Sequence, residues 1–323
     1  MAYQVLPTSL AAIGALVSLR LLLWTANFIS FHFWRRSTNN LAAYKRAGTD
    51  SYALITGGSA GIGFGIARAL VRQGFGVILL GHLPDELASA AKKLDSHRVR
   101  TLVVNARTST PEQLSEAVAS ISDLPVSILV NNVGGFPIAD PPLRPLSTFS
   151  MADIDGQIDM NARFMARLTN LVLPLLSKGR QNDERSLILN LSSAGRVGLP
   201  WLVMYCSTKA FNYAFSTALA RELEDDPATA HIDSLAIVPG EVQSQANVMA
   251  KGAITADAYG EAVVGGVDGA VRRKWREMRP YWGHDLQLSI GENVLPESWF
   301  TYFSREELRL KKNRWDVTMA KRQ

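Results

Sequence analysis

Short apolar runs alternate with amphipathic stretches along most of the chain, and this alternation predicts a sheet covered by helices. Six apolar runs have the length of buried strands: residues 52–56, 76–80, 99–104, 126–130, 187–191 and 232–238. Apolar residues recur at helical spacing between these runs: residues 66–73, 85–94, 111–121, 152–176 and 202–224. Repeated strand–helix units predict one α/β domain with a doubly wound parallel sheet, in which ligands bind at the carboxyl ends of the strands.

The amino-terminal segment has a different pattern from the rest of the chain. Residues 5–34 are almost all apolar, and Arg20 is the single charge among them. Residues 10–34 are long enough to span a bilayer, which needs about 20 residues. Because a charge near the middle of a span is costly, a helix that lies in the membrane interface stays open as an alternative. A cleaved signal peptide fits poorly, since the positive charge follows the apolar stretch.

The pattern divides the chain into a membrane anchor at residues 1–36, a polar linker at 37–50 and a folded domain at 51–323. Within that domain, a substrate and tail region begins at about residue 245. Basic residues beside a membrane segment favour the cytosolic side. Four of them follow the apolar segment closely: Arg35, Arg36, Lys45 and Arg46. We therefore expect a membrane-associated protein whose folded domain faces the cytosol.

The composition suits a globular domain with a substantial core, since 47% of the 323 residues are hydrophobic and 20% are charged. The formal net charge of +5 is modest for this length and does not indicate a nucleic-acid partner. The single cysteine, Cys206, excludes an internal disulfide, and no cysteine–histidine cluster has the spacing of a metal site. Neither a nucleic acid nor a metal ion is therefore expected.

A glycine-rich segment joins the first predicted strand to the first predicted helix. Gly57, Gly61 and Gly63 follow the strand in the spacing Gly-x-x-x-Gly-x-Gly, which differs from the better known Gly-x-Gly-x-x-Gly. Glycines let the backbone approach a phosphate closely, and the helix amino end supplies free N–H groups and a partial positive charge. Glycine clusters also form plain turns, but the position between strand and helix favours a dinucleotide-binding turn.

The fifth predicted strand and the helix after it carry residues suited to proton transfer. Tyr205 and Lys209 stand four residues apart and so share one face of the predicted helix. A phenol ordinarily titrates near pH ~10, and an ammonium one turn away would lower that pKa. Ser192, at the end of the strand, could then hold a substrate oxygen beside the phenol. Many helices place a tyrosine and a lysine four apart by chance, so the upstream glycine-rich turn carries much of this inference.

In the order and spacing of its motifs, the chain resembles the short-chain dehydrogenase/reductase family over roughly residues 52–244. The resemblance rests on Thr56-Gly57-x-x-x-Gly61-x-Gly63, Asn131-Asn132-Val133-Gly134, Asn161, Ser192, Tyr205-x-x-x-Lys209 and Pro239-Gly240. It implies a Rossmann-type fold and hydride transfer between a nicotinamide dinucleotide and a carbonyl or alcohol.

The resemblance also implies a role for each matching residue. Tyr205 would be the acid and base, while Lys209 would bind the nicotinamide ribose and tune Tyr205. Ser192 would hold the carbonyl oxygen, because it stands thirteen residues before Tyr205, as the serine does in the family. Asn161 would anchor a water in the proton relay. Besides Tyr205 and Lys209, the residues expected at the dinucleotide are Gly57, Ser59, Gly61, Ile62, Gly63, His82, Asn105, Asn132, Gly134, Pro239, Gly240, Val242 and Ser244.

The end of the second strand bears on the choice of dinucleotide. An acidic residue there would hold the 2′-hydroxyl of NAD and repel the 2′-phosphate of NADP. The strand at residues 76–80 runs into Gly81-His82-Leu83-Pro84, and the first acidic residue is Asp85. We therefore expect NADPH as the cofactor in preference to NADH.

Within the family, the apolar amino-terminal segment and the Asn-Asn-Val-Gly motif are similar to one membrane-bound branch. That branch contains very-long-chain 3-oxoacyl-CoA reductases and related 17β-hydroxysteroid dehydrogenases, although it usually has arginine where His82 stands and aspartate where Asn105 stands. The resemblance implies reduction of a small apolar ketone, such as a 3-oxoacyl-CoA or a steroid-like carbonyl, at the endoplasmic reticulum. It is compatible with a homo-oligomer.

Three alternatives to this interpretation remain open. The protein could be a dehydrogenase that oxidises an alcohol, or a ketoreductase of secondary metabolism. It could also be a membrane scaffold that binds dinucleotide without turnover, although the intact set of Asn161, Ser192, Tyr205 and Lys209 disfavours that.

Two features of the tail lie outside these motifs. His284 stands close to Tyr281 and Trp282 and is expected to be structural or to line a substrate pocket. Residues 305–323 carry seven basic and three acidic residues. This balance fits either a helix on an anionic membrane surface or a solvated tail.

Overall fold

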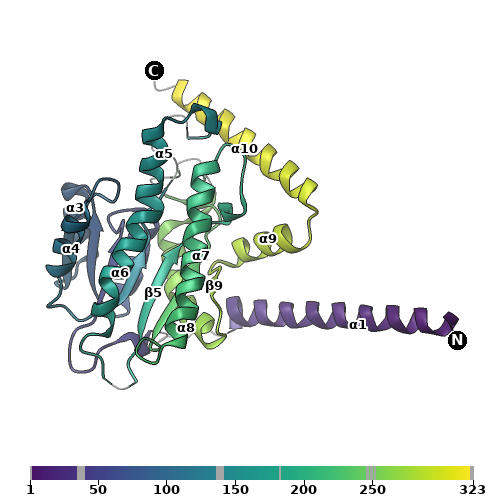
Figure 1. The fold of residues 1–323 in the computed structure, drawn as a ribbon, viewed down its shortest axis with the longest axis horizontal. Coiled ribbons are helices and arrows are strands. Elements are labelled where there is room, and N and C mark those ends of the chain that lie inside the picture. The colour runs from purple at the N-terminus through teal and green to yellow at the C-terminus, as the bar shows by residue number, and fades with distance from the viewer. Residues whose placement is uncertain are drawn as a thin grey trace.

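The computed structural model of the chain describes residues 2–34, 41–135, 142–181, 183–244, 247, 250 and 252–320. Its centre is a sheet of seven parallel strands in the order β3-β2-β1-β4-β5-β6-β9, which confirms the doubly wound α/β fold (Figure 1). The strands of this sheet are β1 (Tyr52–Thr56), β2 (Gly76–Gly81), β3 (Val99–Val103), β4 (Val126–Asn131), β5 (Ser186–Leu191), β6 (Ile232–Ile237) and β9 (Glu277–Met278). A separate pair consists of β7 (Val242–Gln243) and β8 (Ile254–Thr255).

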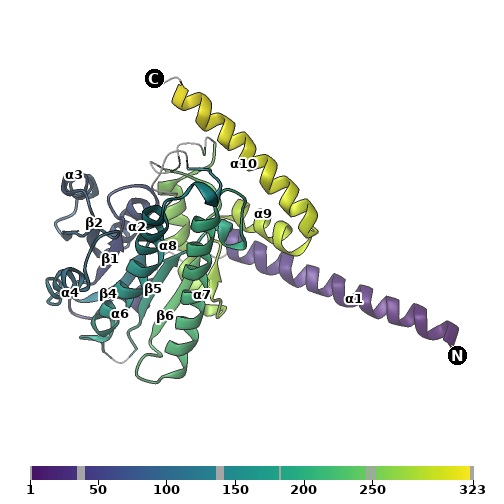
Figure 2. The ribbon, with the colours of Figure 1, turned by 45° about the horizontal axis from the view of Figure 1, so that its top comes forward.

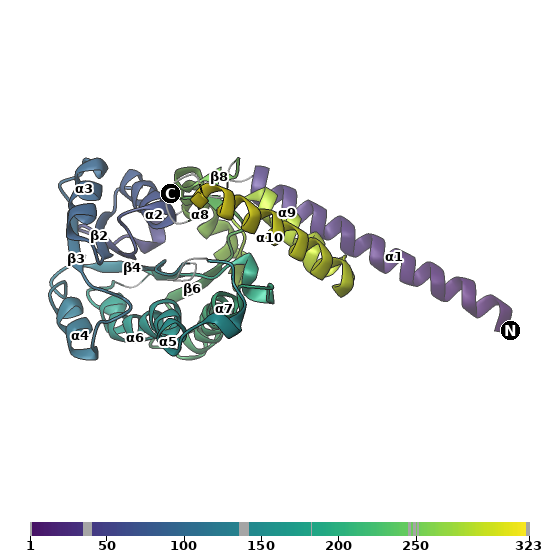
Figure 3. The same cartoon turned by 90° about the horizontal axis from the view of Figure 1, so that it is seen from above.

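Helices cover both faces of the sheet, as Figure 3 shows with the sheet seen from above. One face carries α2 (Gly61–Arg72), α3 (Pro84–Leu94) and α8 (Ala256–Arg272), and the other carries α4 (Pro111–Ala119), α5 (Met151–Ile158), α6 (Phe164–Ser177) and α7 (Val203–Asp225). Neighbouring residues of β1 serve the two layers in turn: Ala53 and Ile55 pack in the core under α2 and α8, while Leu54 packs in the core under α6. Because both faces are buried, the central strands read as continuous apolar runs.

Two helical patterns differ from the sequence prediction in a way that matters for the site. The first helix, expected from residue 66, begins already at Gly61, so the glycine-rich segment forms its first turn. The helix expected at residues 152–176 is interrupted by a wider π-helical turn, η4 (Asp159–Arg163), between α5 and α6. Asn161 lies in that turn, and such turns are frequent at functional sites.

The predicted substrate and tail region, from about residue 245, contains regular secondary structure. Beyond α8 and the short edge strand β9, it contains α9 (Trp282–Asn293) and α10 (Glu297–Ala320). These two helices meet at a corner that lies away from the sheet, and α10 runs back over the carboxyl ends of the strands (Figures 1 and 2).

The amino-terminal helix α1 (Ala2–Ile29) projects from the domain (Figure 1). The apolar stretch Ser9–Trp34 is long and apolar enough to cross a membrane, and its most apolar window has no buried residue. Two residues near the end of this stretch, Phe31 and His32, are nevertheless buried against the domain. In the π-helical turn η1 (Ser30–Trp34), Phe31 packs 4.8 Å from the Trp275 ring, and His32 Nε2 lies 2.9 Å from Asp285 Oδ2.

Within the predicted linker at residues 37–50, three residues of the described part, 41–50, pack into the folded domain. Leu41, Tyr44 and Arg46 are all buried, the first two around the short turn η2 (Ala42–Tyr44). The Arg46 guanidinium donates to the carbonyl oxygens of Arg185 and Leu176, at 2.9 Å each. These hydrogen bonds satisfy carbonyl groups inside the domain. The Arg46 charge therefore lies within the fold and not beside the membrane, as its sequence position had suggested.

Candidate active site

The residues singled out for chemistry converge at the carboxyl edge of the sheet. Ser192 and Ser193 directly follow β5, Tyr205 and Lys209 lie in the first turns of α7, and Asn161 approaches from η4. Parallel strands bring their carboxyl ends to one edge, and in doubly wound sheets this edge is where ligands bind.

Asn161 joins the loop after β4 to α7. Its side-chain oxygen accepts from the Gly135 N–H at 3.2 Å, and its amide donates to the Gly135 carbonyl at 3.3 Å and to the Thr208 hydroxyl at 3.0 Å. The residue is fully buried. All of these contacts are made to protein groups, so Asn161 fixes the relative position of the loop and the helix that carries Tyr205.

Lys209 is buried, with 4% of its surface exposed, and its Nζ donates to the Leu191 carbonyl at 3.0 Å. Gly134, with φ of +143°, leaves room for it, because a Cβ there would lie 2.9 Å from Nζ and 3.1 Å from Asn161 Oδ1. Burial lowers the pKa of Lys209 to about 8. The amine therefore titrates close to physiological pH.

Tyr205 does not have the lowered pKa that its spacing from Lys209 suggested. Its ring lines a cavity, but burial raises the pKa of the phenol to about 12, against the opposing effect of a hydrogen bond with Ser193. The Lys209 Nζ lies 6.0 Å from the centre of the ring. Burial therefore decides the direction of the shift, and the phenol is protonated at neutral pH.

The structure does not place Ser192 where its thirteen-residue spacing suggested. The Ser192 hydroxyl donates inward to the Lys209 carbonyl at 2.7 Å, and the residue is 1% exposed. Ser193, and not Ser192, is among the described residues that line the cavity, and it is the hydroxyl bonded to Tyr205. Successive residues of an extended chain point to opposite sides, so only one of the two can face a substrate. The position fits Ser193.

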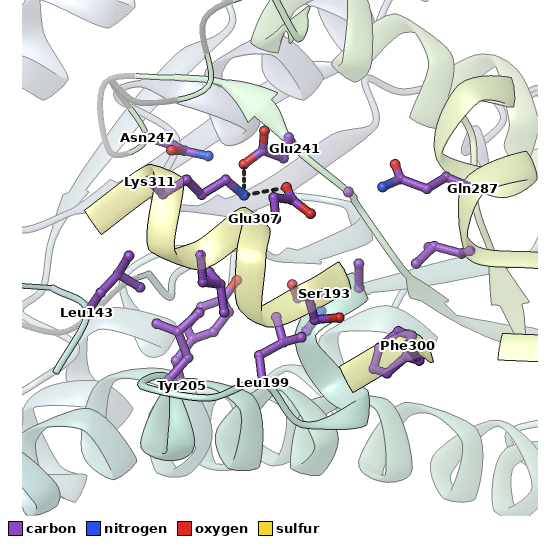
Figure 4. A pocket seen from close by; sticks show the side chains of 17 residues that line it. Leu143, Ser193, Leu199, Tyr205, Glu241, Asn247, Gln287, Phe300, Glu307 and Lys311 are labelled. Atoms are coloured by element: carbon purple, nitrogen blue, oxygen red, sulfur yellow. Dashed lines mark hydrogen bonds and ion pairs between the residues drawn. The ribbon is translucent and has the colours of Figure 1, made fainter. Parts of the chain in front are cut away.

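A cavity of about 190 Å³ lies in front of Tyr205 and Ser193 (Figure 4). Its walls contain both apolar and polar side chains. The residues that line it are Leu143, Ser193, Ala194, Gly195, Leu199, Leu202, Tyr205, Gly240, Glu241, Asn247, Gln287, Leu288, Phe300, Ser304, Glu307, Leu308 and Lys311. The carboxyl-terminal helix α10 therefore forms one wall of the candidate site, although no motif in this segment indicates such a role.

An ion-paired lysine fastens α10 to the loop after β6. Lys311 Nζ lies 2.5 Å from Glu241 Oε1 and 2.8 Å from Glu307 Oε1 (Figure 4). Burial lowers the pKa of Lys311, but the hydrogen bonds to both carboxylates outweigh it and leave the pKa raised. The amine stays charged at neutral pH and holds the helix over the cavity.

His284 of α9 supports the Pro239-Gly240 turn, which was expected to contact the dinucleotide. Its Nδ1 accepts from the Gly240 N–H at 3.1 Å, and its Nε2 lies 2.9 Å from the Glu241 carbonyl oxygen. Burial lowers the pKa of His284, which favours the neutral ring with a proton on Nε2. Two roles were expected for His284, a structural one and the lining of a substrate pocket. These contacts support the structural role.

The turn after β1 has the shape needed to hold a dinucleotide pyrophosphate. Gly57 has φ of +62°, and a Cβ at Gly63 would lie 2.3 Å from the Gly57 carbonyl oxygen. Helix α2 starts after Ala60, which offers no side chain to cap it. The first N–H groups of the helix are therefore left for a phosphate. Ser59 and Ile62 belong to this same turn.

Two other residues expected at the dinucleotide frame this turn. The Asn132 amide donates to the carbonyls of Thr56 and Gly57 at 2.9 and 3.3 Å, so it holds the turn in place from β4. Ser244 lies on the opposite side, with its Cβ 3.4 Å from where a Cβ of Gly61 would be. Val242 is buried in β7 nearby.

An acidic residue that the sequence analysis did not single out, Glu86, lies near the expected adenosine end of the site. His82 and Asn105, both expected at the dinucleotide, are exposed after the ends of β2 and β3. Glu86, in the first turn of α3, accepts from the Ser59 hydroxyl at 3.4 Å. Glu86 lies beyond the strand end, and the helix that follows the strand brings its carboxylate back to the glycine-rich turn.

Comparisons with known proteins agree with this geometry. A family model described as short chain dehydrogenase matches residues 51–252. The chain is 30% identical over 262 residues to the very-long-chain 3-oxoacyl-CoA reductase of Candida albicans, an alignment that covers 77% of this chain and 73% of that relative.

Solved structures share the fold. A short chain dehydrogenase from Shigella flexneri, complexed with NADP, has a TM-score of 0.62 and 22% identity, over 71% of this chain and 95% of that chain. The 3-ketoacyl-(acyl-carrier-protein) reductase from Brucella melitensis, complexed with NADH, has a TM-score of 0.57 and 23% identity, over 66% of this chain and 88% of that chain. At these identities the likeness concerns the fold alone.

Proposed function

This chain belongs to the short-chain dehydrogenase family and is an NAD(P)-dependent oxidoreductase, and we propose on that premise that it reduces an apolar ketone to a secondary alcohol. The observation that carries the proposal is the position of the Tyr205 phenol, which lines the cavity and shares a hydrogen bond with Ser193. The relative in Candida albicans is named for the reduction of very-long-chain 3-oxoacyl-CoA. A 3-oxoacyl thioester is therefore our first candidate substrate class.

In the proposed mechanism, Tyr205 donates the proton to the oxygen of the ketone. Its pKa of about 12 keeps the phenol protonated at neutral pH, which suits reduction better than oxidation of an alcohol. The Ser193 hydroxyl would hold the same oxygen, and its bond with Tyr205 orients the two groups toward one point. Lys209, when charged, would stabilise the phenolate that proton donation leaves behind. Asn161 is a positioning residue through its contacts with Gly135 and Thr208.

A nicotinamide dinucleotide, when bound, supplies the hydride for this reduction. The turn at Gly57 to Gly63 and the amino end of α2 would hold its pyrophosphate, and Ser244 and the Pro239-Gly240 turn lie at the same edge. The intact arrangement of Tyr205, Lys209 and Asn161 argues against a scaffold that only binds dinucleotide.

We expect the rate of ketone reduction to fall as the pH rises above about 8. Lys209 has its pKa lowered to about 8, so its ammonium is present below that pH and is lost above it. Tyr205 remains protonated through the same range. A profile of kcat against pH from about 6 to about 10 should show this single loss. Lys209→Met should have low activity without the step near pH 8, and a wild-type profile that stays flat would contradict the role of Lys209.

We expect NADPH to be used more efficiently than NADH, because neither strand β2 nor the turn after it presents an acid at the place of the 2′-hydroxyl. Glu86, bonded to Ser59, is the group that would oppose this preference. Glu86→Gln keeps the shape and removes the charge, so it should raise the NADPH-to-NADH ratio of kcat/KM by about five- to tenfold. Asp85→Asn, one position earlier, is the matched control and should have a smaller effect. Equal efficiency with both dinucleotides in the wild type would show that the missing strand-end acid is uninformative.

We propose that the protein is attached to the endoplasmic reticulum membrane by α1, with the α/β domain on the cytosolic side. The unburied apolar stretch Ser9–Trp34 supports attachment. Arg35, Arg36 and Lys45 support the orientation, whereas Arg46 no longer does because it is buried. Subcellular fractionation of the full-length chain tests the assignment, which recovery in the soluble fraction would overturn.

The proposed function is tested with a panel of ketones assayed with both dinucleotides. The panel should contain 3-oxoacyl-CoAs of several chain lengths, steroid ketones and polyketide-like ketones, with the full-length protein in detergent or lipid. Reduction of long-chain 3-oxoacyl-CoA above the other classes supports the proposal. Preference for a polyketide-like ketone would place the chain in secondary metabolism, and oxidation of the alcohols without reduction of any ketone would reverse the proposed direction.

A further inference from the structure

The corner between α9 and α10 exposes five large apolar side chains on the side of the domain from which α1 projects. Each is between 44% and 70% exposed. The five are Ile290, Val294, Trp299, Tyr302 and Phe303; we call them the corner patch. Exposed apolar groups of this size, gathered on one feature of a soluble surface, mark an interaction site.

Helix α10 has two apolar faces with different surroundings. Phe300, Ser304 and Leu308 point to the cavity in front of Tyr205. Trp299 and Phe303 recur at the spacing of another face, which also carries the exposed Leu310. The inner face is accounted for by the candidate active site. Nothing in the described part of the chain covers the outer face.

The corner patch is fixed in place relative to α1. Helix α9 contacts the end of the amino-terminal segment, since the Trp282 ring lies 6.4 Å from the Phe33 ring and Asp285 bonds His32. Figures 1 and 2 both show the corner extending from the domain to the same side as α1. A bilayer that receives α1 would therefore meet the corner as well.

We propose that the corner patch inserts into the surface of a lipid bilayer beside α1, so that the cavity opens at that surface. Tryptophan and tyrosine favour the membrane–water boundary, where one end of the ring is apolar and the other wet. Along α10 the aromatic residues are followed by Arg305 and Arg309, about 9 and 15 Å from Trp299 at the rise of a helix. Those cations would lie at the level of the lipid headgroups.

This placement has a consequence for the substrate. The two helices that meet at the corner also line the cavity, α9 through Gln287 and Leu288 and α10 through Phe300 (Figure 4). A ketone carrying a long alkyl chain could then reach Tyr205 while its chain stays in the bilayer. The corner patch would thus determine the route by which the substrate enters the cavity, whereas Tyr205 and Ser193 determine the reaction.

Insertion is tested with a nitroxide spin label on the full-length protein in phosphatidylcholine nanodiscs. The label is attached to a cysteine at Val294 or, as a control, at Glu112, which lies on α4 on the far side of the sheet. The native Cys206 is buried, and the wild-type protein treated in the same way gives the background. We expect the label at Val294 to collide more with dissolved oxygen and less with a water-soluble nickel chelate than the label at Glu112. Equal access to nickel at both positions would overturn the proposal, as would shielding of Val294 from both reagents, which indicates a protein partner.

A second experiment tests the consequence for substrate entry and rests on the proposed function. The double variant Trp299→Asp, Phe303→Asp changes exposed residues outside the cavity lining. Its kcat/KM for a long-chain 3-oxoacyl-CoA in phosphatidylcholine vesicles should fall by about tenfold, with no change for water-soluble acetoacetyl-CoA. Met151→Asp, at an exposed methionine on α5, is the control and should change neither. An equal loss of kcat/KM with both substrates, or no loss with either, would contradict entry from the bilayer. If the wild type reduced no ketone at all, the proposed function would be rejected and the spin-label result would still stand.

Discussion

Replacing Tyr205 by phenylalanine is expected to lower kcat for ketone reduction by ~100- to 10,000-fold, the usual range for loss of general acid catalysis. The variant keeps the ring that lines the cavity and removes the one phenol that lies beside Ser193 there. The effect should fall on kcat, because the proton is transferred only in the transition state. Steady-state kinetics with the best ketone of the panel, at saturating dinucleotide, measure it.

Dinucleotide binding is the control for this variant. The phosphates would be held by the backbone of the Gly57 to Gly63 turn and not by the phenol, so the Kd of Tyr205→Phe for NADPH should match that of the wild type. Lys209→Met is expected to differ, since the amine has two tasks and its loss should weaken turnover and cofactor binding together. If Tyr205→Phe reduced the ketone at a near-normal rate, the proposed proton donor would be wrong.

Ser193→Ala is expected to lower kcat by about 100-fold or more, as loss of a hydrogen bond to a developing oxyanion does. Ser192→Ala should leave kcat almost unchanged. Its hydroxyl contacts only the Lys209 carbonyl inside the fold among the bonds described, so the change should cost about 1 kcal/mol of folding stability instead. Parallel measurement of kcat and of thermal unfolding separates the two serines.

The two serine variants form a matched pair, because the residues are neighbours, have the same side chain and are both shielded from solvent. A large loss of kcat in Ser192→Ala with a normal rate in Ser193→Ala would restore the assignment based on spacing. It would also imply that the strand end rotates when substrate binds.

The sheet was predictable because its central strands are buried on both faces. Residues 52–56 form a continuous apolar run for this reason, and the predicted bounds coincide with those of β1. The edge strand β9 contains two residues, too few to show any periodicity, so it was missed. For helix α10 the sequence left a helix and a solvated tail as alternatives. Its apolar residues serve two faces, and its charges resemble those of a solvated tail.

The candidate site was predictable as a set of residues but not as an arrangement. The motifs placed Tyr205, Lys209 and Asn161 together, and the structure brings all three to one edge of the sheet. Counting residues back from Tyr205 could not decide between Ser192 and Ser193. The spacing depends on the length of the turn η5 (Ala194–Val197) between strand and helix, whereas the alternation of side chains along the strand sets the direction in which each serine points. Nor could spacing reveal that burial raises the pKa of Tyr205.

The central claim, that this chain reduces a ketone with a hydride from the dinucleotide and a proton from Tyr205, is tested most directly by following deuterium. The full-length protein is given the preferred ketone and a reduced dinucleotide deuterated at the transferred position, and the alcohol is examined by mass spectrometry. We expect one deuterium on the carbinol carbon of each product molecule, formed by the wild type and almost absent with Tyr205→Phe. An alcohol without deuterium, or no alcohol from any ketone of the panel, would contradict the account.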